Sequence, residues 1–198
     1  SPRYHRTNHG VARGMNSIAS PGQLRASFLR WALVLTPVIL LLGRLSSMAG
    51  NPDSQWFQGL TKPATFPPEA TFGIIWAILY ILMGLAAAMI AAAPGAAGRG
   101  LALAVFALQL AINLAWTPIF FGMHKMSTAL YLLFALDLAV LVTLILFWRI
   151  RPRAGMLLLP YLAWVLFATL LNWQFLEANR DADGMPTANP VHRIQLGS

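Results

Sequence analysis

The feature that most constrains the fold of this chain is a series of five long apolar segments. A helix needs about 20 consecutive apolar residues to cross the roughly 30 Å hydrocarbon core of a bilayer. We expect such spans at residues 28–48, 72–93, 101–121, 128–148 and 156–176. The first is the weakest, because Arg30 and Arg44 bracket it, although both arginines can extend their head groups to the interface. The sequence therefore predicts an all-α integral membrane protein, a bundle of five transmembrane helices.

Composition supports a membrane protein. Hydrophobic residues make up 58% of the chain and charged residues only 10%, whereas a soluble domain carries about 25% charged residues. The net charge is +8, but the basic residues lie mainly in tails and loops, which indicates lipid headgroup contact and not nucleic-acid binding. The chain has no cysteine, which excludes disulfides, thiolate metal sites and a cysteine nucleophile.

The distribution of Lys and Arg predicts the orientation. With five spans, the N-terminal tail shares a side with the loops after the second and fourth spans. That side carries nine basic residues and the other side five. By the positive-inside rule the N-terminus is cytoplasmic. We expect a multi-pass protein of the bacterial cell membrane, or of the mitochondrial outer membrane in a eukaryote.

Both ends of the chain differ from the membrane domain predicted at residues 28–179. Residues 1–27 form a basic tail, which we interpret as a cloning remnant, a disordered natural extension or a segment resembling a mitochondrial transit peptide. Residues 180–198 are polar and contain Pro186 and Pro190, so we expect a disordered C-terminal tail.

The longest loop, residues 50–71, joins the first two spans. It contains four prolines, which stiffen it, together with Trp56, Phe57 and Phe66, which make it apolar enough to pack on the bundle. We predict a lid over a binding site. The alternative is a loop lying in the headgroup region as part of an aromatic belt.

Three helical stripes point to an internal site. On a helix, Gln109, Asn113, Trp116 and Thr117 share one face of the third span. Polar groups in hydrocarbon are costly unless they are satisfied, so this face should point inward. Aromatic stripes recur in the second and fifth spans: Phe72, Trp76 and Tyr80, and Tyr161, Trp164, Ala168 and Asn172. Together they could form a slot for a planar, mostly apolar ligand. The alternative is that these residues only hold the helices together.

Three blocks of residues carry a resemblance to a known family. They are Lys62-Pro63 followed by Pro67-Pro68 and the Phe72 stripe, the run from Gln109 to Gly122, and the run from Pro160 to Asn172. In order and spacing they resemble the translocator protein family, the tryptophan-rich sensory proteins, over about residues 33–179. The chain departs from many bacterial members at Ala64, Thr65 and Ala70, where those members carry tryptophans.

The resemblance implies a five-helix bundle that binds porphyrins such as protoporphyrin IX and haem as ligands. The sequence shows no pair of His, Cys or Tyr suited to axial haem ligation, no metal cluster and no Ser-His-Asp set, so we expect no obligate cofactor, metal ligand or catalytic residue. Some members also bind sterol-like molecules, but no Lys or Arg follows Tyr161 before Arg180, so the sterol pattern of animal members is missing. The ligand site implied by the family and the stripes comprises Trp56, Pro67, Phe72, Trp76, Gln109, Asn113, Trp116, Phe120, Trp164, Phe167, Ala168, Leu171 and Asn172.

Other functions stay open at this point. The family suggests a receptor or carrier with a regulatory or transport role in tetrapyrrole metabolism or stress response. Alternatives are light- and oxygen-dependent porphyrin degradation and lipid or sterol transport, although five spans without visible repeats argue against a transporter.

Two residues and one helix face need separate interpretation. Asp137 is the one acid within a span, and it could relay protons or pair with a ligand cation. The alternatives are that it bonds Asn or Thr neighbours inside the bundle or faces a lipid defect near a dimer contact. His124 lies in a short loop, so we expect it to be solvated and not to act as a haem ligand. A small-residue ridge on the third span lets a second helix approach closely, so we expect a homodimer contact there, at Ala104, Ala107, Ala111 and Ala115. The alternative is that this ridge packs within the monomer.

Overall fold

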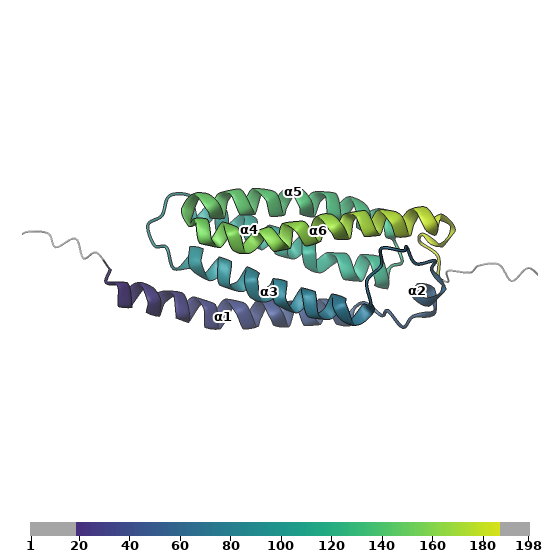
Figure 1. Ribbon diagram of the computed structural model, residues 1–198, viewed down its shortest axis with the longest axis horizontal. Helices are drawn as coiled ribbons and strands as arrows, with labels where there is room; N and C mark the ends of the chain where they lie inside the picture. The colour runs from purple at the N-terminus through teal and green to yellow at the C-terminus, as the bar shows by residue number, and fades with distance from the viewer. Residues whose placement is uncertain (1–18, 187–198) are drawn as a thin grey trace, which may run out of the picture.

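The computed structural model describes residues 19–186 as a bundle of five long helices lying side by side (Figure 1). These are α1 (Pro21–Met48), α3 (Glu69–Ala91), α4 (Arg99–Thr117), α5 (Met126–Ile150) and α6 (Pro152–Ala178). A π-helical turn, η1 (Pro118–Gly122), continues α4. All five are long and apolar enough to cross a membrane. The prediction of an all-α bundle of five spans is confirmed, and no strand occurs within the described residues.

The N-terminal helix begins at Pro21 and not at residue 28, because a capping box precedes it. The Ser20 hydroxyl accepts a hydrogen bond from the Gln23 backbone N–H (3.2 Å), and the Gln23 side chain accepts one from the Ser20 N–H (2.9 Å). These bonds satisfy two N–H groups that a helix start otherwise leaves unpaired. The rest of the predicted N-terminal tail, residues 1–18, lies outside the described residues.

The predicted start of the disordered C-terminal tail, residue 180, is too early, because the chain is still ordered against the end of the bundle there. The chain forms a short 3-10 helix, η2 (Arg180–Ala182), and then crosses the end of the bundle. The Ala182 carbonyl accepts a hydrogen bond from Trp56 Nε1 (3.0 Å), and the Gly184 N–H donates to the His124 carbonyl (2.7 Å). Burial of Ala182 against aromatic rings orders this polar segment. Residues 187–198 lie outside the described part of the chain.

The loop between α1 and α3 covers the same end of the bundle and contains a short helix, α2 (Gln55–Gly59) (Figure 1). Ser54 caps this helix by accepting from the Phe57 N–H (3.2 Å). Asn179 fixes the loop from the other side, because its side chain accepts from the Thr61 N–H (2.7 Å) and donates to the Thr61 carbonyl (2.8 Å). We call residues 50–71 the roof loop.

Glycines let α1 and α3 approach closely. A Cβ built at Gly84 would lie 2.6 Å from Cα of Thr36, and one built at Gly43 would lie 2.7 Å from Cδ2 of Tyr80. Small residues at such crossings allow backbones to pack without lipid between them. The Gly43 crossing also holds the Tyr80 ring in place at the wall of the cavity described below.

Charges are unevenly divided between the two ends of the bundle. The end where α1 begins carries six arginines and, among residues 19–186, no acid: Arg25, Arg30, Arg99, Arg149, Arg151 and Arg153. The roof end carries both signs: Arg44, Lys62, Lys125 and Arg180 with Asp53, Glu69, Glu177, Asp181 and Asp183. This asymmetry favours a cytoplasmic N-terminus, which stays a prediction.

Candidate functional site

A cavity of about 660 Å³ lies beneath the roof loop, and residues of all five long helices and of η1 line it. This volume is in the range of small-molecule sites, about 300–1,000 Å³. The roof loop supplies Pro52, Phe57 and Phe66 to its lining, so the loop covers a cavity as the lid interpretation predicts. Nine of the predicted ligand residues line the cavity: Phe72, Trp76, Asn113, Trp116, Phe120, Trp164, Ala168, Leu171 and Asn172.

Aromatic rings form two walls of the cavity. On α3, Trp76 stacks on Tyr80, with ring centroids 5.5 Å apart and planes 28° apart. Trp116 of α4 stacks on Phe120 of η1 in the same way, at 5.0 Å and 24°. Trp164 stands at 86° to Trp76, with a centroid distance of 6.5 Å. Stacked rings present flat faces, so the walls suit a flat apolar body.

Four predicted ligand residues do not line the cavity. Trp56 is buried in the roof, where it stacks on His124 at 4.5 Å and bonds the Ala182 carbonyl. Pro67 lies in the roof loop away from the lining, and Phe167 packs beside Trp164 on the neighbouring side of α6. Gln109 lies one helical turn beyond Asn113 and is 1% exposed. The inward face of α4 therefore continues past the cavity floor into the helix core.

Buried polar side chains form a network at the cavity floor. The Tyr80 hydroxyl donates to Asn113 Oδ1 (2.9 Å), and Asn113 Nδ2 donates to the Tyr161 hydroxyl (3.0 Å). The Tyr161 hydroxyl in turn donates to Gln109 Oε1 (2.7 Å). The network joins α3, α4 and α6, so the interpretation of the stripe as helix-to-helix bonding is correct for Gln109. Asn113 takes part in the same bonding while it also faces the cavity.

A second pair of polar groups at the cavity wall is also satisfied within the protein. Trp116 Nε1 donates to Asn172 Oδ1 (3.0 Å), and Asn172 Nδ2 donates to the Met126 carbonyl (2.9 Å). These bonds join α4 and α6 to the start of α5. Both residues face the cavity, but their hydrogen-bonding groups are largely used.

Two charged residues at the cavity were not predicted as ligand residues. Arg44 from α1 and Glu69 from the first turn of α3 both line it and are both exposed. The additional aromatic lining residues are Phe57, Phe66, Tyr80, Phe121 and Phe175. Arg44 falls near the end of its span, where the sequence pattern indicates only an interfacial anchor. Tyr80 belongs to the aromatic stripe predicted in the second span.

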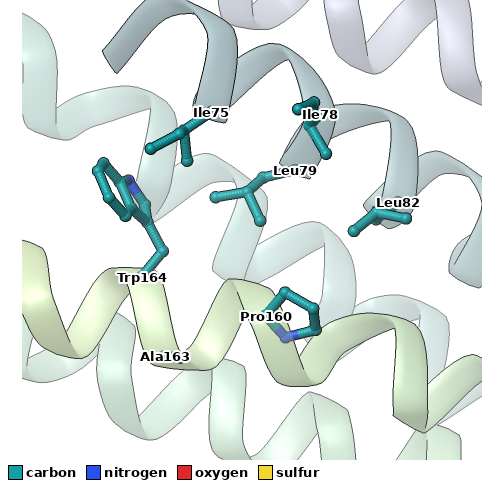
Figure 2. A pocket seen from close by; sticks show the side chains of 7 residues that line it. All are labelled: Ile75, Ile78, Leu79, Leu82, Pro160, Ala163 and Trp164. Atoms are coloured by element: carbon teal, nitrogen blue, oxygen red, sulfur yellow. The ribbon is translucent and has the colours of Figure 1, made fainter. Parts of the chain in front are cut away.

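A separate groove of about 440 Å³ lies on the outer surface between α3 and α6. Figure 2 shows Trp164 and Pro160 of α6 facing Ile75, Leu79 and Leu82 of α3. Trp164 borders both this groove and the inner cavity. Its Nε1 is buried and has no hydrogen-bond partner among residues 19–186. Because Trp164 lines both, its indole ring separates the outer groove from the inner cavity.

Asp137 lies on α5 and does not line the cavity. Its Oδ2 accepts a hydrogen bond from the Thr169 hydroxyl (2.8 Å), which agrees with the interpretation that it bonds a neighbour inside the bundle. His124 is half-buried in the roof and not simply solvated, since its Nδ1 lies 2.9 Å from the Met185 carbonyl. The predicted dimer ridge faces outward on α4, with Ala104, Ala107 and Ala111 exposed and Ala115 half-buried.

The five spans and the roofed cavity at one end define a multi-pass integral membrane protein that encloses a small-molecule-sized site. Comparison with known proteins identifies the group. Residues 32–177 match the TspO/MBR family, and the chain belongs to this family. The resemblance found in the three sequence blocks is therefore confirmed.

Relatives in bacteria and animals share this domain. The chain is 40% identical over 149 residues to a tryptophan-rich sensory protein of Cereibacter sphaeroides, covering 75% of this chain and 92% of that protein. It is 38% identical over 128 residues to the protein CrtK of Rhodobacter capsulatus, covering 63% and 78%. It is 37% identical over 121 residues to the human translocator protein, covering 60% and 72%. These names support a sensory or transport role in a membrane.

Proposed function

We propose that this protein binds porphyrins, such as protoporphyrin IX and haem, in the cavity beneath the roof loop. The observation that carries this proposal is the pair of stacked aromatic walls, Trp76 with Tyr80 and Trp116 with Phe120, around a cavity of about 660 Å³. Flat rings stack favourably on flat aromatic ligands. The relatives' names as sensory and translocator proteins agree with binding linked to signalling or transport.

The proposed role is that of a receptor or carrier in tetrapyrrole metabolism or stress response, with the bilayer as its environment and no nucleic acid as a partner. Porphyrin is the ligand and not a fixed cofactor, and no metal ligation or catalytic residue is part of the proposal. Sterol-like molecules are a second ligand class to be compared in the same assay.

The test is quenching of intrinsic tryptophan fluorescence by protoporphyrin IX in detergent. Ala168 lies on α6 at the cavity wall, so Ala168→Phe fills the site. Leu170 is on the same helix and faces outward, 46% exposed, so Leu170→Phe is the matched control. We expect saturable quenching by wild type and by Leu170→Phe, and loss of saturable quenching in Ala168→Phe.

Either of two quenching results would contradict porphyrin binding in the cavity. Unsaturable quenching, or equal quenching in both variants, means that porphyrin partitions into the micelle and does not occupy the cavity. Loss of porphyrin absorbance under illumination, dependent on the intact cavity, would instead support the alternative of light-dependent degradation. Tight binding of cholesterol with no porphyrin binding would support the sterol alternative.

A further inference from the structure

The hydrogen-bonding groups inside the cavity leave few positions for a polar ligand atom. Tyr80, Asn113, Trp116 and Asn172 all face the cavity, and each uses hydrogen-bonding groups within the protein. A ligand atom can bind these groups only by adding to or displacing an existing bond. The buried Trp164 Nε1 also borders the cavity and has no partner among residues 19–186, so it can donate one hydrogen bond to a ligand. A single neutral donor cannot balance a charge, so a charged part of the ligand must be recognised elsewhere on the lining.

Among residues 19–186, Arg44 is the one cation that lines the cavity. Its guanidinium makes a single long hydrogen bond within the described residues, from Nη1 to the Ser47 hydroxyl (3.5 Å), and no ion pair there. The Ser47 hydroxyl donates its own proton to the Arg44 carbonyl (2.7 Å), so its oxygen faces the guanidinium as an acceptor. Most of the five guanidinium N–H donors therefore have no partner among residues 19–186.

The other cations of the roof end are not placed to replace Arg44. Lys62 donates to the Phe57 carbonyl (3.2 Å) and lies 4.8 Å from the centre of the Phe57 ring. Arg180 pairs with Glu177 at 2.5 Å. Neither Lys62, Arg180 nor Lys125 lines the cavity. The single charge that opposes Arg44 on the lining is Glu69, which forms no ion pair within residues 19–186.

We propose that Arg44 binds the carboxylate of the ligand, and that the cavity thereby selects flat amphipathic acids over neutral molecules of the same shape. The aromatic walls hold the apolar body, while the guanidinium on α1 holds the acidic edge at the rim. Arginine suits this role, because its planar fork can bind a carboxylate through two parallel hydrogen bonds. Glu69 opposes it by repelling the same carboxylate. This inference rests on the proposed porphyrin site and adds its specificity.

The experiment compares protoporphyrin IX, which carries two carboxylates, with its dimethyl ester, which has the same ring and none. Binding of each is measured by tryptophan quenching for wild type and Arg44→Gln. The matched control is Arg30→Gln, also an exposed arginine of α1, 14 residues away and so about 21 Å along the helix. Glu69→Gln is the complementary variant.

We expect wild type and Arg30→Gln to bind the acid more tightly than the ester, and this preference to weaken as salt screens the charge. In Arg44→Gln the Kd of the acid should rise roughly tenfold, the range for a hydrogen bond to a charged group, while the Kd of the ester stays unchanged. Glu69→Gln should strengthen binding of the acid alone. Retained ester binding shows that Arg44→Gln is folded.

The outcomes separate this inference from the proposed function. If acid and ester bind equally to wild type, or if Arg44→Gln weakens both to the same extent, Arg44 does not recognise the carboxylate, although the porphyrin site stands. If neither compound binds saturably to wild type, the porphyrin site itself is refuted.

Discussion

The close crossing of α1 and α3 at Gly84 gives a prediction whose size follows from the structure. A Cβ at Gly84 would lie 2.6 Å from the backbone Cα of Thr36 and 2.9 Å from its Cβ. Because the nearest carbon is a backbone atom, no side-chain rotation can relieve the overlap. Gly84→Ala must therefore push the two helices apart or strain one of them. Gly73, on the same helix, has nothing within 4 Å of the corresponding Cβ position.

The comparison of Gly84→Ala with Gly73→Ala isolates the cost of this overlap. Alanine stabilises a helix interior by about 1 kcal/mol relative to glycine, and this gain applies to both variants. Overpacking a tight contact costs about 1–3 kcal/mol. We therefore expect Gly73→Ala to gain up to about 1 kcal/mol and Gly84→Ala to be less stable than Gly73→Ala by about 1–3 kcal/mol.

The assay is unfolding of each variant in mixed micelles by increasing amounts of an ionic detergent, followed by far-ultraviolet circular dichroism. Both glycines lie in α3, so the same helix reports both changes. Equal stabilities for the two variants would refute the reasoning, because they would mean that α1 and α3 do not approach closely at Gly84.

Three further predictions follow from the polar network, the roof and the alanine ridge. Tyr161→Phe removes the hydroxyl that bonds two buried amide side chains, so detergent-induced unfolding should show a loss of about 1–3 kcal/mol; no loss would contradict the network. Trp56→Phe removes the hydrogen bond to the Ala182 carbonyl, so limited proteolysis after residue 178 should become about fivefold faster, as loss of about 1 kcal/mol implies. Unchanged cleavage would show that this bond does not hold the segment. We propose that the exposed alanines of α4 form a homodimer contact, so Ala107→Trp should lower the dimer fraction in light scattering, whereas Leu138→Trp on the outer face of α5 should not. A dimer that persists in Ala107→Trp would place the contact elsewhere.

The sequence predicts the helices well because the bilayer limits what an apolar segment can do. A run such as Met126–Ile150 has no alternative to a helix in hydrocarbon, since its backbone polar groups must be paired internally. The ends depend on finer signals. The capping box at Ser20 sets the start of α1, whereas hydropathy alone places that start near residue 28, and α2 lies in a loop whose prolines and aromatics do not indicate a helix.

The cavity lining is predictable where it lies on a long helix and less so in the roof. The stripe of Trp76 and Tyr80 follows from helical periodicity alone. In α2, however, neighbouring residues point in different directions: Phe57 reaches the cavity while Trp56 turns to Ala182. That choice depends on contacts with residues more than a hundred positions away in the chain, which no local pattern contains.

The same periodicity cannot tell a binding amide from a packing amide. Asn113 and Gln109 are one turn apart on the same face, yet only Asn113 borders the cavity. The difference is set by where the aromatic rings of α3 and α6 leave space. Gln109 is a predicted ligand residue that does not line the cavity, whereas Arg44 lines the cavity without being predicted. The sequence pattern indicates only an interfacial anchor for a charge near the end of a span, and the cavity beside Arg44 is not encoded in that pattern.

The internal pairing of the cavity's amides has a consequence for selectivity. A site that presents unpaired polar groups rejects any analogue that cannot bond them, because those groups would be left dry and unsatisfied. Here Asn113 and Asn172 are hydrogen-bonded within the protein before any ligand binds, so a ligand that makes no hydrogen bond to them incurs no such penalty. The interior itself sorts molecules by thickness and outline, while Arg44 at the rim favours an acidic edge, so flat acids with chemically unrelated bodies should compete for the same space.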